Sequence, residues 1–190
     1  MFKPILFNTD MVQAILEDRK TVTRRVIKPQ PKTDSTVTLF STFDYADISY
    51  DGVLKLSPYQ PGDILYVRET WAKVKGESRY LYKADKVDFI YKELHSSWKW
   101  KPSIHMPKEA ARIFLRVTNV SVAKLQDITE EQAKAEGAEE NNILDAVHEF
   151  RIIWDDTLKG EKALIEYGWV ANPWVWVIEL ERTEKPNEWI

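Results

Sequence analysis

Short stretches in which hydrophobic and polar residues alternate recur along the chain, and this period of two is typical of half-buried strands. A turn signal at Pro61-Gly62-Asp63 precedes one such stretch, and Pro173 opens another whose tryptophans share a face. The expected strands cover residues 4–7, 21–26, 37–41, 64–68, 79–83, 112–122 and 174–180. The pattern therefore predicts a protein dominated by strands.

Helical spacing appears in fewer segments. Asn8 or Thr9 can cap a first helix, which ends near residues 18–20 although no glycine stops it. In residues 127–137, Thr129 and Gln132 have the spacing of a capping box, and Gly137 is a natural stop. A third helix is expected from Asn141 or Asn142 to Leu158, just before Lys159-Gly160.

Because strands outnumber helices and the two do not alternate regularly, we expect an α+β fold with a mixed or mostly antiparallel sheet, curled into a small barrel. Neither an internal repeat nor a domain boundary appears, so residues 1–190 are expected to form a single domain. Residues 86–107 are aromatic and basic without a clean period, and the region from about 73 to 111 is interpreted as an insertion. Residues 184–190 are expected to be a loose tail.

Composition narrows the function classes. The net charge of −3 gives no overall basic field, so any nucleic-acid binding must rely on a local patch. The chain has no cysteine, and its three histidines lack metal-ligand spacing, so neither a metal site nor a cofactor is expected. No apolar run reaches membrane-spanning length and no signal peptide is evident. We expect a cytoplasmic protein without membrane contact, whose oligomeric state the sequence leaves open.

The segment from Arg19 to Arg25 is the first candidate site, because cations and hydroxyls suit an anionic or amide-bearing ligand. A lysine that loses solvation beside other cations has a depressed pKa and can act as a base, which makes Lys20 a candidate. Thr23 can attack a carbonyl or orient a water, and Arg19, Arg24 and Arg25 supply neighbouring charge. The alternative is a solvated basic turn after a helix.

Glu136 is the second candidate. It falls in the last helical turn of residues 127–137, where the helix dipole disfavours a carboxylate by roughly 0.3–1 kcal/mol. Such a residue can have a cationic partner, and Lys20 or Arg25 would serve. The alternative is an exposed acid at negligible cost.

Two further segments carry aromatic and cationic residues. Arg68 and Trp71 at a strand end could clamp a planar ligand, or form a structural ion pair beside a core tryptophan. Trp98 and Trp100 alternate with lysines, which suits base stacking with phosphate contact, although aromatics can also pin a loop to the core. His105 follows them and is either a ligand contact or a hydrogen-bonded structural histidine.

The order of several short motifs resembles the ASCH domain family of the PUA-like superfamily, in particular a phage-associated group. The signature is Arg19-Lys20-Thr21-Val22-Thr23-Arg24-Arg25. The other matching segments are residues 3–7, 62–71, 102–107, 125–129, 135–137 and 172–177.

This resemblance implies a PUA-like β-barrel with flanking helices and a cleft for RNA or a nucleobase. Small bacterial ASCH enzymes hydrolyse the acetyl amide of N4-acetylcytidine. Their lysine and threonine, at Lys-x-x-Thr spacing, correspond to Lys20 and Thr23, and their glutamate corresponds to Glu136. The chain is longer than those enzymes, and residues from about 73 to 112 have no counterpart in them.

Three functions are consistent with these observations. In the first, an amide hydrolase acts on an acylated nucleoside through Lys20, Thr23 and Glu136, with RNA or a modified nucleoside as its partner. In the second, the same cleft belongs to a non-catalytic module that binds RNA or a modified base. In the third, a phage protein binds a host protein in the host cytoplasm, which a large exposed apolar patch would favour.

Overall fold

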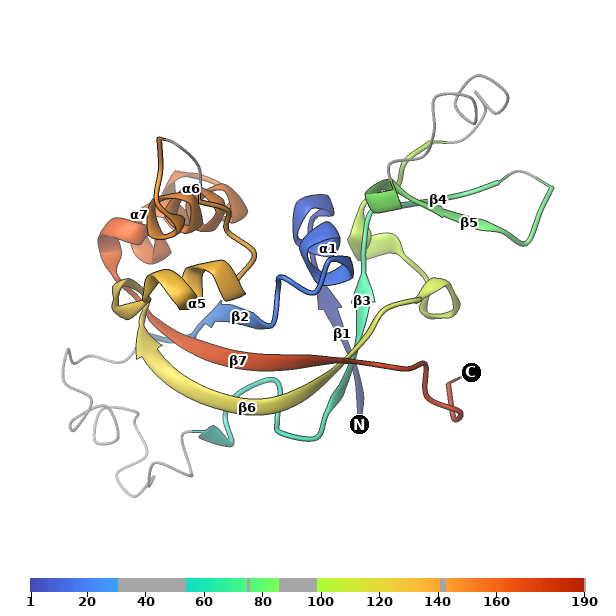
Figure 1. Ribbon diagram of the computed structural model, residues 1–190, viewed down its shortest axis with the longest axis horizontal. Helices are drawn as coiled ribbons and strands as arrows, with labels where there is room; N and C mark the ends of the chain where they lie inside the picture. The colour runs from blue at the N-terminus through green and yellow to red at the C-terminus, as the bar shows by residue number, and fades with distance from the viewer. Residues whose placement is uncertain (31–53, 75, 86–98, 141–142, 190) are drawn as a thin grey trace. The chain divides into compact units, whose positions relative to one another are not determined.

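The computed structural model describes residues 1–30, 54–74, 76–85, 99–140 and 143–189 (Figure 1). By its internal contacts the chain forms two compact units. Unit 1 comprises Met1–Lys20, Asp63–Arg116 and Glu181–Ile190, and unit 2 comprises Thr21–Gly62 and Val117–Leu180. The long strands β6 (Phe114–Lys124) and β7 (Trp174–Thr183) each contribute residues to both units.

The expected α+β class is confirmed, with a five-stranded mixed sheet in the order β1-β3-β6-β7-β2. Strand β1 (Phe2–Leu6) pairs parallel with β3 (Ile64–Arg68), which pairs antiparallel with β6. At the other edge, β2 (Val22–Val26) pairs antiparallel with β7. Among the described residues this sheet has two open edges, β1 and β2, and is not closed into a barrel.

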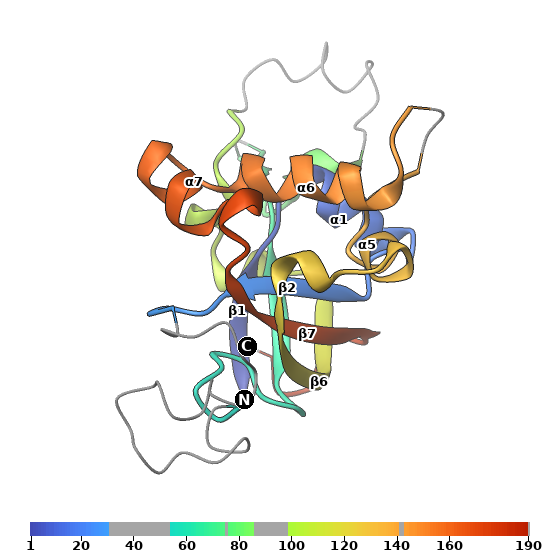
Figure 2. The same ribbon diagram turned by 90° about the vertical axis from the view of Figure 1, so that its left-hand side faces the viewer.

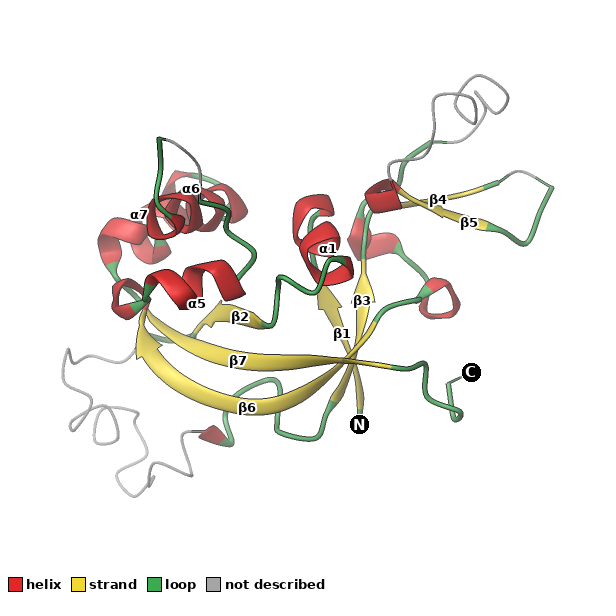
Figure 3. Ribbon diagram, in the orientation of Figure 1, coloured by secondary structure: helices red, strands yellow, loops and turns green. Residues whose placement is uncertain are grey.

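In unit 1, helix α1 (Thr9–Leu16) follows β1 and begins at Asn8, whose side chain accepts from the Met11 backbone amide. The helix ends without glycine because Asp18 adopts the left-handed conformation, with φ of 56°. Gly62, at φ of 89°, allows the turn into β3, in the Pro61-Gly62-Asp63 segment that signals a turn in the sequence. A separate ribbon pairs β4 (Trp71–Lys73) with β5 (Tyr80–Tyr82) (Figure 3).

The expectation of a loose C-terminal tail is wrong. Trp189 is buried in a cluster with Trp71, Met106 and Phe114, and its ring centroid lies 4.9 Å from those of both Tyr66 and Phe114. A buried indole of this size contributes apolar area that a disordered tail would leave in water. The same cluster contains Ala110 and Ala111, so part of the expected insertion belongs to the core of unit 1.

In unit 2, three helices lie on one side of β2 and the adjoining parts of β6 and β7 (Figures 1 and 2). They are α5 (Glu130–Ala135), α6 (Ala146–Thr157) and α7 (Glu161–Tyr167). The third expected helix begins later than Asn141 or Asn142, because Asp145 caps α6 through the His148 backbone amide. Phe150 and Trp154 of α6 pack in one core cluster with Val175 and Val177 of β7.

Candidate functional site

Strand β2 carries the C-terminal part of the basic segment and is more deeply buried than a solvated turn would be. Thr23 is 1% exposed and Arg24 is 3% exposed. The strand pairs with β7 in a register that sets Thr23 opposite Ile178 and Arg24 opposite Val177. Because side chains alternate along a strand, Thr23 and Arg25 lie on one face and Arg24 on the other.

Lys20 is the last residue of unit 1 and follows the turn that ends α1. Its backbone amide donates to the Ala14 carbonyl at 3.1 Å. The side chain is buried, and its Nζ lies 5.5 Å from the centroid of the Phe7 ring. An ammonium over an aromatic face gains an electrostatic attraction that partly replaces lost hydration.

Glu136 is also buried, at 5% exposed, and forms the C-cap of α5. The expected capping box at the start of the helix is confirmed. The Thr129 hydroxyl accepts from the Gln132 backbone amide, and Gln132 Oε1 accepts from the Thr129 backbone amide. Gly137 follows Glu136 at φ of 94°, so the chain leaves the helix immediately after the carboxylate.

Arg24 connects the strand to this helix. Its Nη1 donates to Glu136 Oε1 at 3.2 Å, and its Nη2 donates to Gln132 Oε1 at 2.8 Å. Both charged side chains of the ion pair are almost fully buried, at 1% and 4% exposed. The Arg24 Nε has no hydrogen-bond partner among the described residues, and the guanidinium lies 5.8 Å from the Phe150 ring centroid. Glu136 therefore has a buried arginine partner, and that arginine is Arg24.

Arg25 lies in the same electrostatic environment. Burial lowers the pKa of Arg25, although Tyr59 and Glu136 both act to raise it. Burial also raises the pKa of Tyr59, which Arg25 opposes. Desolvation is thus the largest effect on the Arg25 guanidinium, and a desolvated cation gains free energy from contact with negative charge.

The candidate residues of this region separate into two groups. The structure buries Lys20, Thr23, Arg24 and Glu136, whereas Arg19 is partly exposed and pairs with Glu17 at 2.6 Å. Lys20 belongs to unit 1, and Thr23 and Glu136 belong to unit 2. Sequence reasoning did not single out Gln132 as a partner of Arg24, although its place in the capping box identifies it as a structural residue. Tyr59 lies in a segment without a regular period and carried no signal.

The second candidate region lies in unit 1. Arg68 donates to the backbone carbonyls of Met106, at 3.0 Å, and Ile104, so its guanidinium holds the segment that contains His105. His105 is exposed. Trp71 is 5% exposed and packs against Tyr80, with Lys101 Nζ 5.0 Å from its ring centroid. Its burial favours a packing role over stacking on a ligand.

The tryptophan–lysine segment is only partly within the described residues. Trp100 is 36% exposed, and Lys101 forms a bridge with Trp71 that ties the segment to β4. Trp98 lies outside the described residues.

Sequence reasoning missed a buried ion pair next to this region. Glu69 is 1% exposed and accepts from Arg112 Nε at 2.9 Å and from Arg112 Nη2 at 3.0 Å. Arg112 also pairs with Asp85 at 2.6 Å and lies over the Tyr82 ring at 4.0 Å. Burial raises the pKa of Glu69, which Arg112 opposes, and raises the pKa of Tyr82 to about 12. No residue spacing reveals this pair, because its members lie far apart in the sequence.

Comparisons with known proteins identify one similar structure and no family. No protein-family model matches the chain, and no curated protein matches it. A solved structure of protein EF3133 from Enterococcus faecalis V583, described by the family DUF984, aligns with a TM-score of 0.44 at 10% identity. The alignment covers 90% of this chain and 66% of that protein. Among the described residues, no helix is long and apolar enough to cross a membrane.

Proposed function

We propose that this chain is an ASCH-like protein of the PUA-like class that recognises a modified nucleoside and hydrolyses its acyl amide, as in N4-acetylcytidine. One observation carries the proposal: Lys20, Thr23 and Glu136 are each at least 95% buried. Burying polar and charged side chains costs free energy that a purely structural position can avoid. Buried polar groups are enriched at functional sites, and these are the three residues that the family resemblance assigns to catalysis.

In the proposed reaction, Lys20 takes a proton from Thr23 or from a water that Thr23 orients. The activated oxygen attacks the acetyl carbonyl carbon, and the carbon–nitrogen bond breaks when the amine takes up a proton that Glu136 shuttles. The products are acetate and cytidine, and in the threonine route a water releases the acetyl group. Arg25 stabilises the negative charge that develops on the carbonyl oxygen.

Arg24 takes a different role from the ligand contact expected of it. Its Nη1 and Nη2 are engaged by Glu136 and Gln132. In this proposal, Arg24 is a positioning residue that fixes the orientation of the Glu136 carboxylate.

The test is a chromatographic assay of the purified protein with N4-acetylcytidine and related acylated nucleosides. Lys20→Ala should abolish turnover, and Lys20→Met, which retains the aliphatic bulk beside Phe7, should do the same. Lys159→Ala removes an exposed lysine and should leave turnover unchanged. Full hydrolysis by folded Lys20→Met would exclude Lys20 as the base.

A non-catalytic nucleic-acid-binding module is the second candidate, and the exposed Trp100 beside the exposed Lys99 and Lys101 favours it. Stacking on an aromatic side chain contributes about 1–3 kcal/mol per base. This function predicts no turnover, together with single-stranded RNA binding that weakens steeply as salt rises and that Trp100→Ala reduces.

A further inference from the structure

Helix α7 of unit 2 exposes apolar side chains that a water-facing helix would not carry. It has seven residues, none of them buried, and Gly160 at its start provides no side-chain cap. Leu164 is 45% exposed and Ile165 is 72% exposed. Helices this short are marginal in water and depend on packing of an apolar face. Leu164 and Ile165 of α7 therefore present apolar surface that no described residue of this chain buries.

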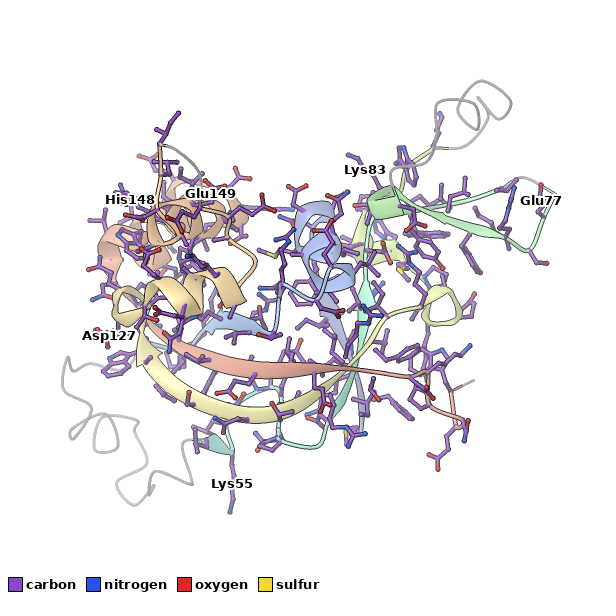
Figure 4. The ribbon with its side chains drawn as sticks, viewed as in Figure 1. Lys55, Glu77, Lys83, Asp127, His148 and Glu149 are labelled. Carbon is purple, nitrogen blue, oxygen red and sulfur yellow. The ribbon has the colours of Figure 1, made fainter. Side chains whose placement is uncertain are left out.

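The neighbouring surface of α6 continues this apolar region. Leu144, Ile152 and Leu164 line a hollow of about 570 Å³ together with His148, Arg151, Asp155 and Asp156. Ile152 is 54% exposed although it lies near the middle of α6. Figure 4 labels His148 and Glu149, which mark the beginning of this helix. We call Leu144, Ile152 and Leu164, with their flanking charges, the α6–α7 face.

The α6–α7 face carries charged side chains of both signs, Arg151 beside Asp155 and Asp156. Asp155 accepts from the Trp169 backbone amide at 2.7 Å, and His148 contacts Asp145 at 2.8 Å, so both already have partners in unit 2. Arg151 and Asp156 form no ion pair with any other described residue. They lie on opposite flanks of Ile152, the arrangement in which charges beside an apolar stripe pair between neighbouring helices.

We propose that the α6–α7 face binds a second copy of this chain. A two-fold interface places the same patch on both partners, so the patch must present complementary charges to itself, and one free arginine with one free aspartate does so. The apolar centre with a mixed polar rim is the usual anatomy of such a contact. A polyanion such as RNA is disfavoured because the lining holds two aspartates and one arginine. This inference does not depend on the proposed hydrolase.

Sedimentation velocity of the full chain over a concentration series tests the proposal. The wild type should form dimers, and Ile152→Asp and Leu164→Asp should each weaken dimerisation by about tenfold or more. Ile104→Asp is the matched control, because Ile104 is 56% exposed and lies in unit 1. It should dimerise like the wild type. All variants change exposed residues and should keep the wild-type unfolding midpoint.

A charge exchange tests the partner's identity. Arg151→Glu and Asp156→Arg should each weaken self-association. An equimolar mixture of the two variants should form heterodimers, because residue 151 of each chain then faces an opposite charge at residue 156 of the other. A wild type that stays monomeric at about 1 mM would overturn the proposal and assign the face to a partner of another kind. Dimers that Ile152→Asp and Ile104→Asp affect equally would overturn it as well.

Discussion

At the scale of single residues, the free energy of burying charge determines how the two carboxylates, Glu69 and Glu136, behave. Each is buried, and Glu69 accepts hydrogen bonds from Arg112 while Glu136 accepts one from Arg24. Removing one partner of a buried ion pair typically costs about 3–5 kcal/mol, because the remaining charge keeps its desolvation penalty without compensation. The stability of each pair can therefore be tested without any substrate.

For Glu69, we expect Arg112→Met to destabilise unit 1 in a pH-dependent way. Burial raises the pKa of Glu69 above its usual value and Arg112 opposes this, so the variant raises it further. When the pKa of a carboxyl is higher in the folded than in the unfolded protein, the stability of the fold is greatest below the unfolded pKa. That stability is lost as the pH rises through the folded pKa. Urea unfolding should thus show a loss of about 3–5 kcal/mol at pH 8 and a smaller loss at pH 4.5.

The double variant Glu69→Gln/Arg112→Met is the control for that experiment, because it removes the titrating carboxylate. Its stability relative to the wild type should change less between the two pH values. An Arg112→Met penalty that is equal at both pH values would contradict burial of an ionised Glu69.

For Glu136, we expect Arg24→Met to cost about 3–5 kcal/mol and Arg24→Met/Glu136→Met to cost much less than the sum of the single substitutions. The reason is the direct contact at 3.2 Å between two nearly inaccessible charges. A double-mutant cycle by urea unfolding measures the coupling. Additive losses would show that Arg24 and Glu136 act independently.

At the scale of elements, the N-terminal cap of α5 connects helix stability to the candidate site. Thr129→Ala should destabilise the protein by about 1 kcal/mol, because it removes the acceptor for the Gln132 amide. The same Gln132 accepts from Arg24, so the variant should also loosen the contact between β2 and α5. Thr129→Ser, which keeps the hydroxyl, should unfold at nearly the wild-type urea concentration. Equal losses in the two variants would exclude capping as the cause.

Helices and strands that carry a turn, cap or periodicity signal in their own residues were predictable from the sequence. Those that depend on packing against other segments were not. Strand β3 matches the expected residues because a turn signal precedes its alternation. Strand β7 begins after Pro173 as expected, yet Val175 and Val177 are as buried as the tryptophans beside them, because both of its faces are covered. Helix α7 was missed because none of its side chains is buried and its sequence has no apolar period of its own.

At the scale of the whole molecule, pairing between residues distant in the sequence was the main property that the sequence did not specify. Periodicity and the resemblance indicated Lys20, Thr23 and Glu136, and the structure buries all three. The contact of Arg24 with Glu136 and the anchoring of Trp189 depend on which segments meet after folding. Residue spacing describes neighbours within one helix or strand and carries no information about contacts between distant segments.

Turnover of N4-acetylcytidine by Glu136→Gln tests the proposed hydrolase activity most directly. Glutamine keeps an oxygen acceptor for Arg24, so the variant should remain folded, but it cannot shuttle a proton. We expect hydrolysis by the wild type and a fall of about 10²–10⁴-fold in the variant, measured at a temperature at which circular dichroism shows the variant to be folded. The unfolding midpoint of the variant should fall, because glutamine leaves the buried Arg24 charge unbalanced. Hydrolysis at the wild-type rate by folded Glu136→Gln would contradict the proposed role of Glu136. No hydrolysis of any acylated nucleoside by the wild type would contradict the proposed activity itself.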